Sequence, residues 1–180
     1  EEMIRKMVDD YFQNAPKING KTILEHIMIK HTKATRIICI ISAEHSQKHI
    51  LRTEINNLRS DAVIVEIPSH KLGPGYAIWQ SRSVINLELK TLISYCDWSG
   101  IWNLEKMLGE LDENDGSILT YTGFHPHMLR ENKYAYVKKD SQNRFIIDIK
   151  EKSSFTNNPM NEEASAGCYG FKSGLILLQS

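Results

Sequence analysis

The stretch RIICIISAEHSQKHILRTEINNLRSDAVIVEI, residues 36–67, decides the fold class. Its two ends, RIICIIS and AVIVEI, are continuous β-branched runs of the kind found in strands that are buried on both faces. A serine that can cap a helix, Ser46, follows the first run. Apolar residues then recur at helical spacing, at Ile50, Leu51, Ile55 and Leu58. Strand, helix and strand in this order form a crossover unit, which predicts a parallel pair of strands.

The same alternation continues on both sides of this unit. Upstream, KTILEHIMIKH (residues 21–31) predicts a helix capped by Asn19 or Gly20. Downstream, the pattern predicts a helix over residues 76–85, a strand over 91–96, a helix over 101–111 and a strand over 117–122. The first two thirds of the chain therefore indicate a Rossmann-like, mostly parallel sheet flanked by helices.

The pattern changes in the last third of the chain. YAYVKK (residues 134–139) and RFIIDIKE (144–151) flank a polar turn, which is typical of a hairpin, and SAGCYGF (165–171) predicts one more short strand. We therefore expect an α/β fold with a smaller antiparallel hairpin element in its C-terminal third.

Length and charge limit the possible functions. The 180 residues are 41% apolar and 24% charged, which suits one domain spanning residues 1–180. The 22 basic and 22 acidic side chains cancel, which disfavours nucleic acid as the main partner. We expect no membrane span and a cytoplasmic location, because no apolar run approaches the length of a bilayer and no leader pattern opens the chain. The ends, EEMIRKM and SGLILLQS, suggest a fragment.

Asp97 is the main candidate for metal chemistry. It stands at the carboxyl end of the strand predicted over residues 91–96, and in open sheets ligands bind beyond the carboxyl ends of the strands. A carboxylate there needs a partner, and Mg²⁺ is commonly held between one carboxylate and substrate phosphates. The equally weighted alternative is that Asp97 caps the following helix or marks a turn.

A glycine turn is the second candidate site. Gly73, Pro74 and Gly75 form a turn that feeds a helix predicted from Tyr76, so that backbone N–H groups can approach a phosphate or a nucleobase edge. An ordinary turn without a ligand is the alternative, and it is the commoner outcome for such a tripeptide.

Three further stretches contain candidate binding residues. TYTGFHPHM (residues 120–128) predicts a polar loop lining a pocket, with Thr122 and Gly123 as donors, and its two histidines lack the companions that a zinc site needs. In DIKEKSSF (148–155), Lys152 can meet a phosphate and Glu151 can accept from hydroxyls, unless both simply lie at a solvated strand end. Gly167 in EEASAGCYGF marks a close backbone approach, either to a ligand or to a neighbouring strand.

Taken in order, six stretches resemble the sugar-phosphate nucleotidyltransferases, especially the bacterial branch found with capsule and surface-polysaccharide genes: GPGYA, SYCD, TYTGFHPHM, YAYVK, IKEKSSFTNNPM and ASAGCYGFKSG. The resemblance runs from about Lys17 to the end of the chain. It implies a GT-A-type, Rossmann-like fold, dependence on Mg²⁺, and transfer of a nucleotidyl group from an NTP, with CTP or UTP favoured, to a phosphorylated sugar or small alcohol with release of pyrophosphate.

The resemblance also implies roles for individual residues. Asp97 would hold the metal, and Lys17, with Pro16, would close the phosphate signature of the family. The turn that holds the nucleobase and ribose would comprise Gly73, Pro74, Gly75, Tyr76 and Ala77. The acceptor would be faced by Tyr121, Thr122, Gly123, Phe124, His125, Glu151, Lys152, Ala166 and Gly167.

The chain departs from the family pattern at its start. EEMIRKMVDDYFQNA contains no glycine where the family has a glycine-rich phosphate loop. This leaves two alternatives: a non-catalytic relative that only binds nucleotide, or a GT-A glycosyltransferase. The second usually has an Asp-x-Asp motif, whereas this chain has Asp97, Trp98 and Ser99.

Overall fold

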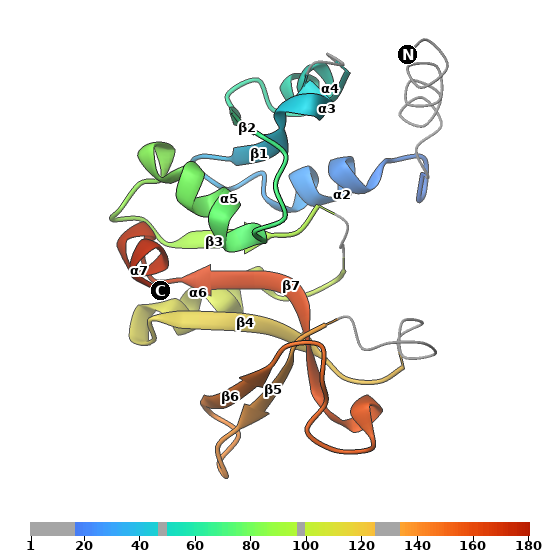
Figure 1. Ribbon diagram of the computed structural model, residues 1–180, viewed down its shortest axis with the longest axis vertical. Coiled ribbons are helices and arrows are strands. Elements are labelled where there is room, and N and C mark those ends of the chain that lie inside the picture. The colour runs from blue at the N-terminus through green and yellow to red at the C-terminus, as the bar shows by residue number, and fades with distance from the viewer. Residues whose placement is uncertain (1–16, 47–49, 97–99, 125–133) are drawn as a thin grey trace. The chain divides into compact units, whose positions relative to one another are not determined.

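The computed structural model describes residues 17–46, 50–96, 100–124 and 134–180 (Figure 1). The chain groups into two compact units. The first unit runs to Glu88 and includes Cys96–Ile101 and Leu178–Ser180; the second comprises Leu89–Tyr95 and Trp102–Leu177. Within the described residues, every helix is too short or too polar to cross a bilayer. The α/β class expected from the sequence is confirmed.

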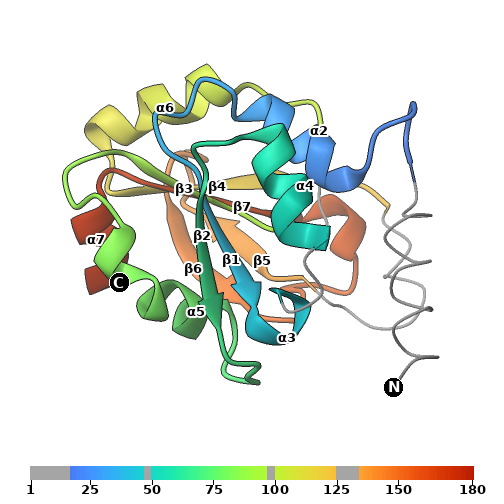
Figure 2. The same cartoon turned by 90° about the horizontal axis from the view of Figure 1, so that it is seen from above.

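The first unit contains the predicted crossover. Strands β1 (Ile38–Ser42) and β2 (Val63–Ile67) pair in parallel, with Ile38 opposite Val63 (Figure 2). Between them lie α3 (Ala43–Ser46) and α4 (Ile50–Leu58). Ile55 of α4 is buried in a cluster with Ile41 and Met28, so the helical face predicted from the sequence does enter the core. Ser46 is the last residue of α3, a short helix that the sequence analysis did not predict.

Helix α2 (Ile23–Lys30) begins later than the sequence predicted. Its N-cap is Thr22, whose side chain accepts from the Glu25 amide while the Glu25 carboxylate accepts from the Thr22 amide. Asn19 and Gly20, the predicted caps, instead form a tight turn with φ of 52° and 78°. That prediction was wrong: the cap is Thr22, which has the extended backbone angles typical of an N-cap and a side chain that accepts from the Glu25 amide.

Helix α5 (Pro74–Gln80) begins earlier than predicted and is followed by the 3₁₀ turn η1 (Arg82–Val84). Pro74 occupies the first helical position, where its missing N–H costs nothing, and Gly73 is the N-cap with φ of 82°. The glycine turn is therefore part of the helix start, and the predicted start at Tyr76 was two residues late.

The second unit is built around β7 (Glu163–Phe171). The sheet has the order β3-β7-β5-β6, and β4 also pairs with β7. Its other strands are β3 (Thr91–Ser94), β4 (Gly116–Tyr121), β5 (Tyr136–Lys139) and β6 (Ile146–Lys150). The remaining elements are helix α6 (Leu104–Glu113), the 3₁₀ turn η3 (Pro159–Asn161) and helix α7 (Gly174–Gln179). Figure 1 shows β7 running between β3 and β4.

The antiparallel part of the fold is larger than the predicted hairpin. The hairpin of β5 and β6 is confirmed. Strands β3 and β4, which the sequence placed in a mostly parallel sheet, run in the same direction but do not pair with each other, because β7 lies between them and is antiparallel to both. The alternation of strands and helices predicts strand direction well, but it does not show that a later strand is inserted between two earlier ones.

Helix α6 packs closely against β7. Its buried residues are Met107 and Leu111, and a Cβ placed on Gly170 of β7 would lie 2.9 Å from Leu111 Cδ1. A side chain at this position would require the ends of the neighbouring side chains of Leu111 and Met107 to move. The contact fixes the end of β7 that pairs with β3.

Candidate active site

A small pocket lies beside β7, at the point where the strand that pairs with β7 changes from β5 to β3. Strand β4 follows one edge of β7, and the opposite edge pairs with β3 through residues 168–171 and with β5 through residues 163–164. Between these two segments the neighbouring strands diverge, at the carboxyl end of β3. The pocket there has a volume of about 60 Å³ and is lined by Tyr95, Tyr134, Ala135, Glu151, Ser165, Gly167 and Tyr169.

Two backbone hydrogen bonds define the walls of the pocket. The Tyr95 amide donates to the Gly167 carbonyl at 3.0 Å, which continues the β3 pairing by one residue. The Ser165 amide donates to the Ala135 carbonyl at 2.8 Å, which begins the β5 side. The opening therefore spans only the few residues of β7 between Ser165 and Gly167.

Gly167 is the residue that shapes the floor of the pocket. Its φ of 72° lies in the left-handed region, and a Cβ built on it would come within 3.0 Å of Tyr95 Cδ2. The register of β4 against β7 also shifts here: Ile118 faces Tyr169, but Thr120 faces Ser165. Such a bulge re-aims side chains and is common beside active sites. The expectation of a close backbone approach at Gly167 is confirmed, and the neighbour is Tyr95.

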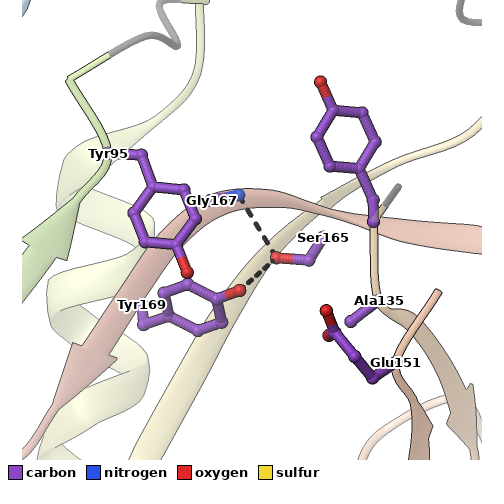
Figure 3. A pocket seen from close by; sticks show the side chains of 7 residues that line it. Tyr95, Ala135, Glu151, Ser165, Gly167 and Tyr169 are labelled. Carbon is purple, nitrogen blue, oxygen red and sulfur yellow. Dashed lines mark hydrogen bonds between the residues drawn. The ribbon is translucent and has the colours of Figure 1, made fainter. Parts of the chain in front are cut away.

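A buried serine holds the polar side of the pocket in place. Ser165 is 3% exposed, its Oγ donates to Tyr169 Oη at 2.9 Å, and it accepts from the Gly167 amide at 3.2 Å (Figure 3). The rings of Tyr95 and Tyr169 lie 6.1 Å apart at a tilt of 56°. The hydroxyl group of Tyr169 is thus fixed by a residue that solvent hardly reaches.

The start of β7 is tied to the neighbouring strands by an ion pair. Lys139 Nζ of β5 donates to Glu163 Oε1 at 2.6 Å, and Thr120 Oγ1 of β4 donates to Glu163 Oε2 at 2.7 Å. Burial alone would raise the pKa of Glu163, but the hydrogen bonds from Lys139 and Thr120, with the charge of Lys139, together lower it. Glu163 therefore links the three strands β4, β5 and β7 as a carboxylate.

The loop that follows β4 was predicted to face an acceptor. Burial raises the pKa of Tyr121 to about 12, with smaller contributions from Tyr134 and Tyr136. The Tyr121 and Tyr134 rings make an edge contact with their centroids 6.3 Å apart, so Tyr121 contacts a residue that lines the pocket. Thr122 is exposed, Phe124 is 59% exposed, and the Gly123 amide donates to the Met160 carbonyl at 2.8 Å. None of these four residues lines the pocket itself.

Other predicted residues are divided between the two units. Glu151 and Gly167, both predicted to face the acceptor, line the same pocket. Lys152, with φ of 54°, donates its amide to the Tyr134 carbonyl, and Ala166 is buried in β7. In the first unit, Lys17 is exposed, and residues 73–77 form the start of α5. Asp97 and His125 lie outside the described residues.

The tyrosines of the pocket were not predicted from the sequence. Tyr95, Tyr134 and Tyr169 were assigned to no site, although all three line the pocket. A signal was present for Tyr169, because residues 165, 167 and 169 alternate along one strand and therefore share a face. The same is not true of Tyr95 and Tyr134, which join the site only through the order of the strands.

Within the parts of the chain that the structure describes, no group of three or more His, Cys, Asp or Glu side chains is placed to hold a metal ion. A metal held by one carboxylate together with substrate oxygens would not form such a group. Asp97, the predicted metal ligand, lies outside the described residues, so its role stays a prediction.

The fold is that of a class of solved structures that includes sugar-phosphate nucleotidyltransferases, and the resemblance inferred from the motifs is confirmed at this level. HddC from Yersinia pseudotuberculosis superposes with a TM-score of 0.65 at 18% identity, over 92% of this chain and 68% of that one. A Bacillus anthracis protein assigned as a glucose-1-phosphate thymidylyltransferase, in complex with sucrose, gives 0.65 at 15% identity, over 88% and 61%. UTP-bound UGPase from Acinetobacter baumannii gives 0.58 at 15% identity, over 87% and 65%.

The chain thus spans 61–68% of the length of these three solved proteins. No protein-family model matches it, and no curated protein sequence does. The similarity to these structures therefore identifies the fold of this chain, and the reaction that it catalyses is a proposal.

Proposed function

We propose that the intact protein transfers a nucleotidyl group from an NTP to a phosphorylated sugar or small phosphorylated alcohol and releases pyrophosphate. Structures of the same fold were solved with GMP-PN, with UTP and with UDP-glucose. Those ligands belong to the neighbours, and they support nucleotide chemistry for this chain through the shared fold alone.

The observation that carries the proposal is the pocket at the carboxyl end of β3. It brings Glu151 and Gly167, both assigned to acceptor binding by the resemblance, to one place on the sheet. A bulge beside a left-handed glycine re-aims side chains, and such bulges are common next to active sites. A purely structural role would not require these two residues to share a cavity.

The reaction needs positioning more than covalent help from the protein. A phosphate oxygen of the acceptor forms a bond to the α-phosphorus of the NTP, and the bond from that phosphorus to the oxygen bridging to the β-phosphate breaks. Pyrophosphate leaves with the electron pair. Because the attacking oxygen is already anionic, the step requires no general base, and the protein contributes by aligning the two substrates.

Mg²⁺ is part of the proposal, with Asp97 as its protein ligand. When bound beside the phosphates, the ion would neutralise charge that develops on the leaving pyrophosphate. We assign Lys17 and Lys152 to contacts with phosphate oxygens, and residues 73–77 to the nucleobase and ribose. A CTP or UTP donor, a role in capsule polysaccharide synthesis and a cytoplasmic location are also proposed from the motifs.

The direct test measures pyrophosphate release by the complete protein encoded by its reading frame, with Mg²⁺, each NTP in turn and a panel of phosphorylated sugars and alcohols. We expect release with one pyrimidine NTP and one acceptor. Binding of a nucleotide without release for any pair would instead identify a non-catalytic relative. Hydrolysis of a nucleotide-sugar without use of an NTP would identify a glycosyltransferase.

Asp97→Asn tests the metal assignment. The substitution removes the charge and keeps the shape, so metal-dependent turnover should be lost. The control is Asp148→Asn on β6, an exposed carboxylate that does not line the pocket. Activity of the Asp97 variant within about tenfold of the parent, or about 1.4 kcal/mol, would remove Asp97 from the metal role.

A further inference from the structure

The side chains of the pocket have an unusual composition for a site that handles phosphates. Of the seven lining residues, three are tyrosines and one is a carboxylate, Glu151. The others are small: Ala135, Ser165 and Gly167. The described lining contains no lysine, arginine or histidine. A phosphate placed here would face a negative charge without a cation to offset it, so the phosphate of an acceptor must lie outside this pocket.

Two of the three aromatic rings are close to each other. The rings of Tyr95 and Tyr169 are tilted by 56° with centroids 6.1 Å apart, and both residues line the pocket. The third ring, that of Tyr134, makes an edge contact with the ring of Tyr121. A cation is attracted to a ring face when it lies within about 6 Å of the centroid, and several such faces together recognise ammonium groups. Figure 3 shows the Tyr95 ring beside the Tyr169 ring, the hydrogen bond from Ser165 to Tyr169, and the Glu151 side chain beyond Ser165 in this view.

The size of the pocket favours a small head group over a whole sugar ring. Its volume is about 60 Å³. A cavity volume of about 10–15 Å³ suffices for one water molecule, so the volume of this pocket suits a group of a few heavy atoms. The hydroxyl of Tyr169 is already engaged by Ser165, which leaves the ring face as the stronger feature that this residue offers.

We propose that this pocket binds the ammonium head of a phosphorylated amino alcohol, with the tyrosine faces around the cation and Glu151 balancing its charge. The inference rests on the proposed function, because the same molecule would be the acceptor of the nucleotidyl group. It narrows the acceptor class from phosphorylated sugars and alcohols in general to small cationic ones.

The test uses the 180-residue chain and isothermal titration calorimetry with phosphocholine as the probe. The matched ligand is 3,3-dimethylbutyl phosphate, in which a carbon atom replaces the nitrogen and only the charge is lost. We expect the neutral analogue to bind at least about tenfold more weakly, because cation–π attraction and the Glu151 charge no longer contribute. Equal binding of the two ligands, or tighter binding of glucose 1-phosphate, would overturn the inference.

Variants assign the binding to this pocket. Glu151→Gln and Tyr95→Leu should each weaken phosphocholine about tenfold or more, whereas Tyr95→Phe keeps the ring face and should bind like the parent. The control is again Asp148→Asn, an exposed carboxylate on the same hairpin that does not line the pocket. Unchanged affinity in Glu151→Gln and Tyr95→Leu would contradict the assignment. A loss in Tyr95→Phe as large as that in Tyr95→Leu would show that the hydroxyl group, and not the ring face, contributes to binding.

Pyrophosphate release separates this inference from the function on which it rests. Release with glucose 1-phosphate, without binding of phosphocholine, would contradict the cationic pocket and support the nucleotidyltransferase reaction. Charge-dependent binding of phosphocholine without release from any NTP would keep the cationic pocket and refute the proposed reaction.

Discussion

Gly167 is a single residue on which the geometry of the candidate site depends. Gly167→Ala should destabilise the second unit by about 1–2 kcal/mol, because a residue with a Cβ pays that much for left-handed backbone angles. The new Cβ would also press on the Tyr95 ring at 3.0 Å. Urea unfolding measures the loss, and the calorimetric titration above should show weaker phosphocholine binding.

A matched glycine provides the control for that experiment. Gly109 lies within α6, and nothing would come within 4 Å of a Cβ placed on it. Gly109→Ala should therefore stabilise the unit by about 0.5–1 kcal/mol, since alanine loses less backbone freedom in a helix. A Gly167 variant that is as stable as the parent would show that the strand can relax around the new methyl group.

The pair of Lys139 and Glu163 gives the second unit a defined response to acid. Because the pKa of Glu163 is lower in the folded state, the stabilisation is fully present above the unfolded-state pKa and is lost as pH falls through the folded-state pKa. Lys139→Met should therefore cost most at about pH 7 and progressively less towards about pH 3. Unfolding midpoints in urea across this range measure the trend.

The control for the charge effect is Lys172→Met, an exposed lysine that directly follows β7. It should change the midpoint little at either end of the range. A loss of stability in Lys139→Met that stays constant with pH would indicate that the aliphatic stem of Lys139, and not its charge, supports the sheet.

At the scale of elements, α2 begins with a capping box formed by Thr22 and Glu25. Thr22→Ala removes the acceptor for the Glu25 amide and should destabilise the first unit by about 1 kcal/mol. Thr35→Ala, an exposed residue ahead of β1, should be nearly neutral. Urea unfolding compares the two, and similar midpoints for both variants would mean that the helix start is held by packing alone.

Elements set by local chemistry were predictable from the sequence. The crossover of β1, α4 and β2 follows from apolar periodicity, and the hairpin of β5 and β6 follows from its polar turn, where Asp140 Oδ1 accepts from the amides of Arg144 and Phe145. The exact helix starts were less predictable. Several residues near each start can serve as a cap. The backbone angles that select one of them cannot be read from the amino-acid sequence.

At the scale of the whole molecule, the sheet of the second unit and the pocket in it could not be predicted from periodicity. Tyr95, Tyr134, Glu151 and Tyr169 come from four separate segments, and they meet because β7 pairs with β3 at one end and β5 at the other. The motif resemblance identified Glu151 and Gly167 but not the aromatic residues beside them. Strand order is a non-local property, and no single segment contains it.

The central place of β7 also has a consequence for how the protein is made. A ribosome produces β3, β4 and β5 before β7, yet each of the three pairs with β7 in the finished sheet. Such long-range pairing is slow to form, and unpaired strand edges invite association with other chains. While the nascent chain waits for residues 163–171, it carries several open edges, so this stage of synthesis is where protection by a chaperone would matter most.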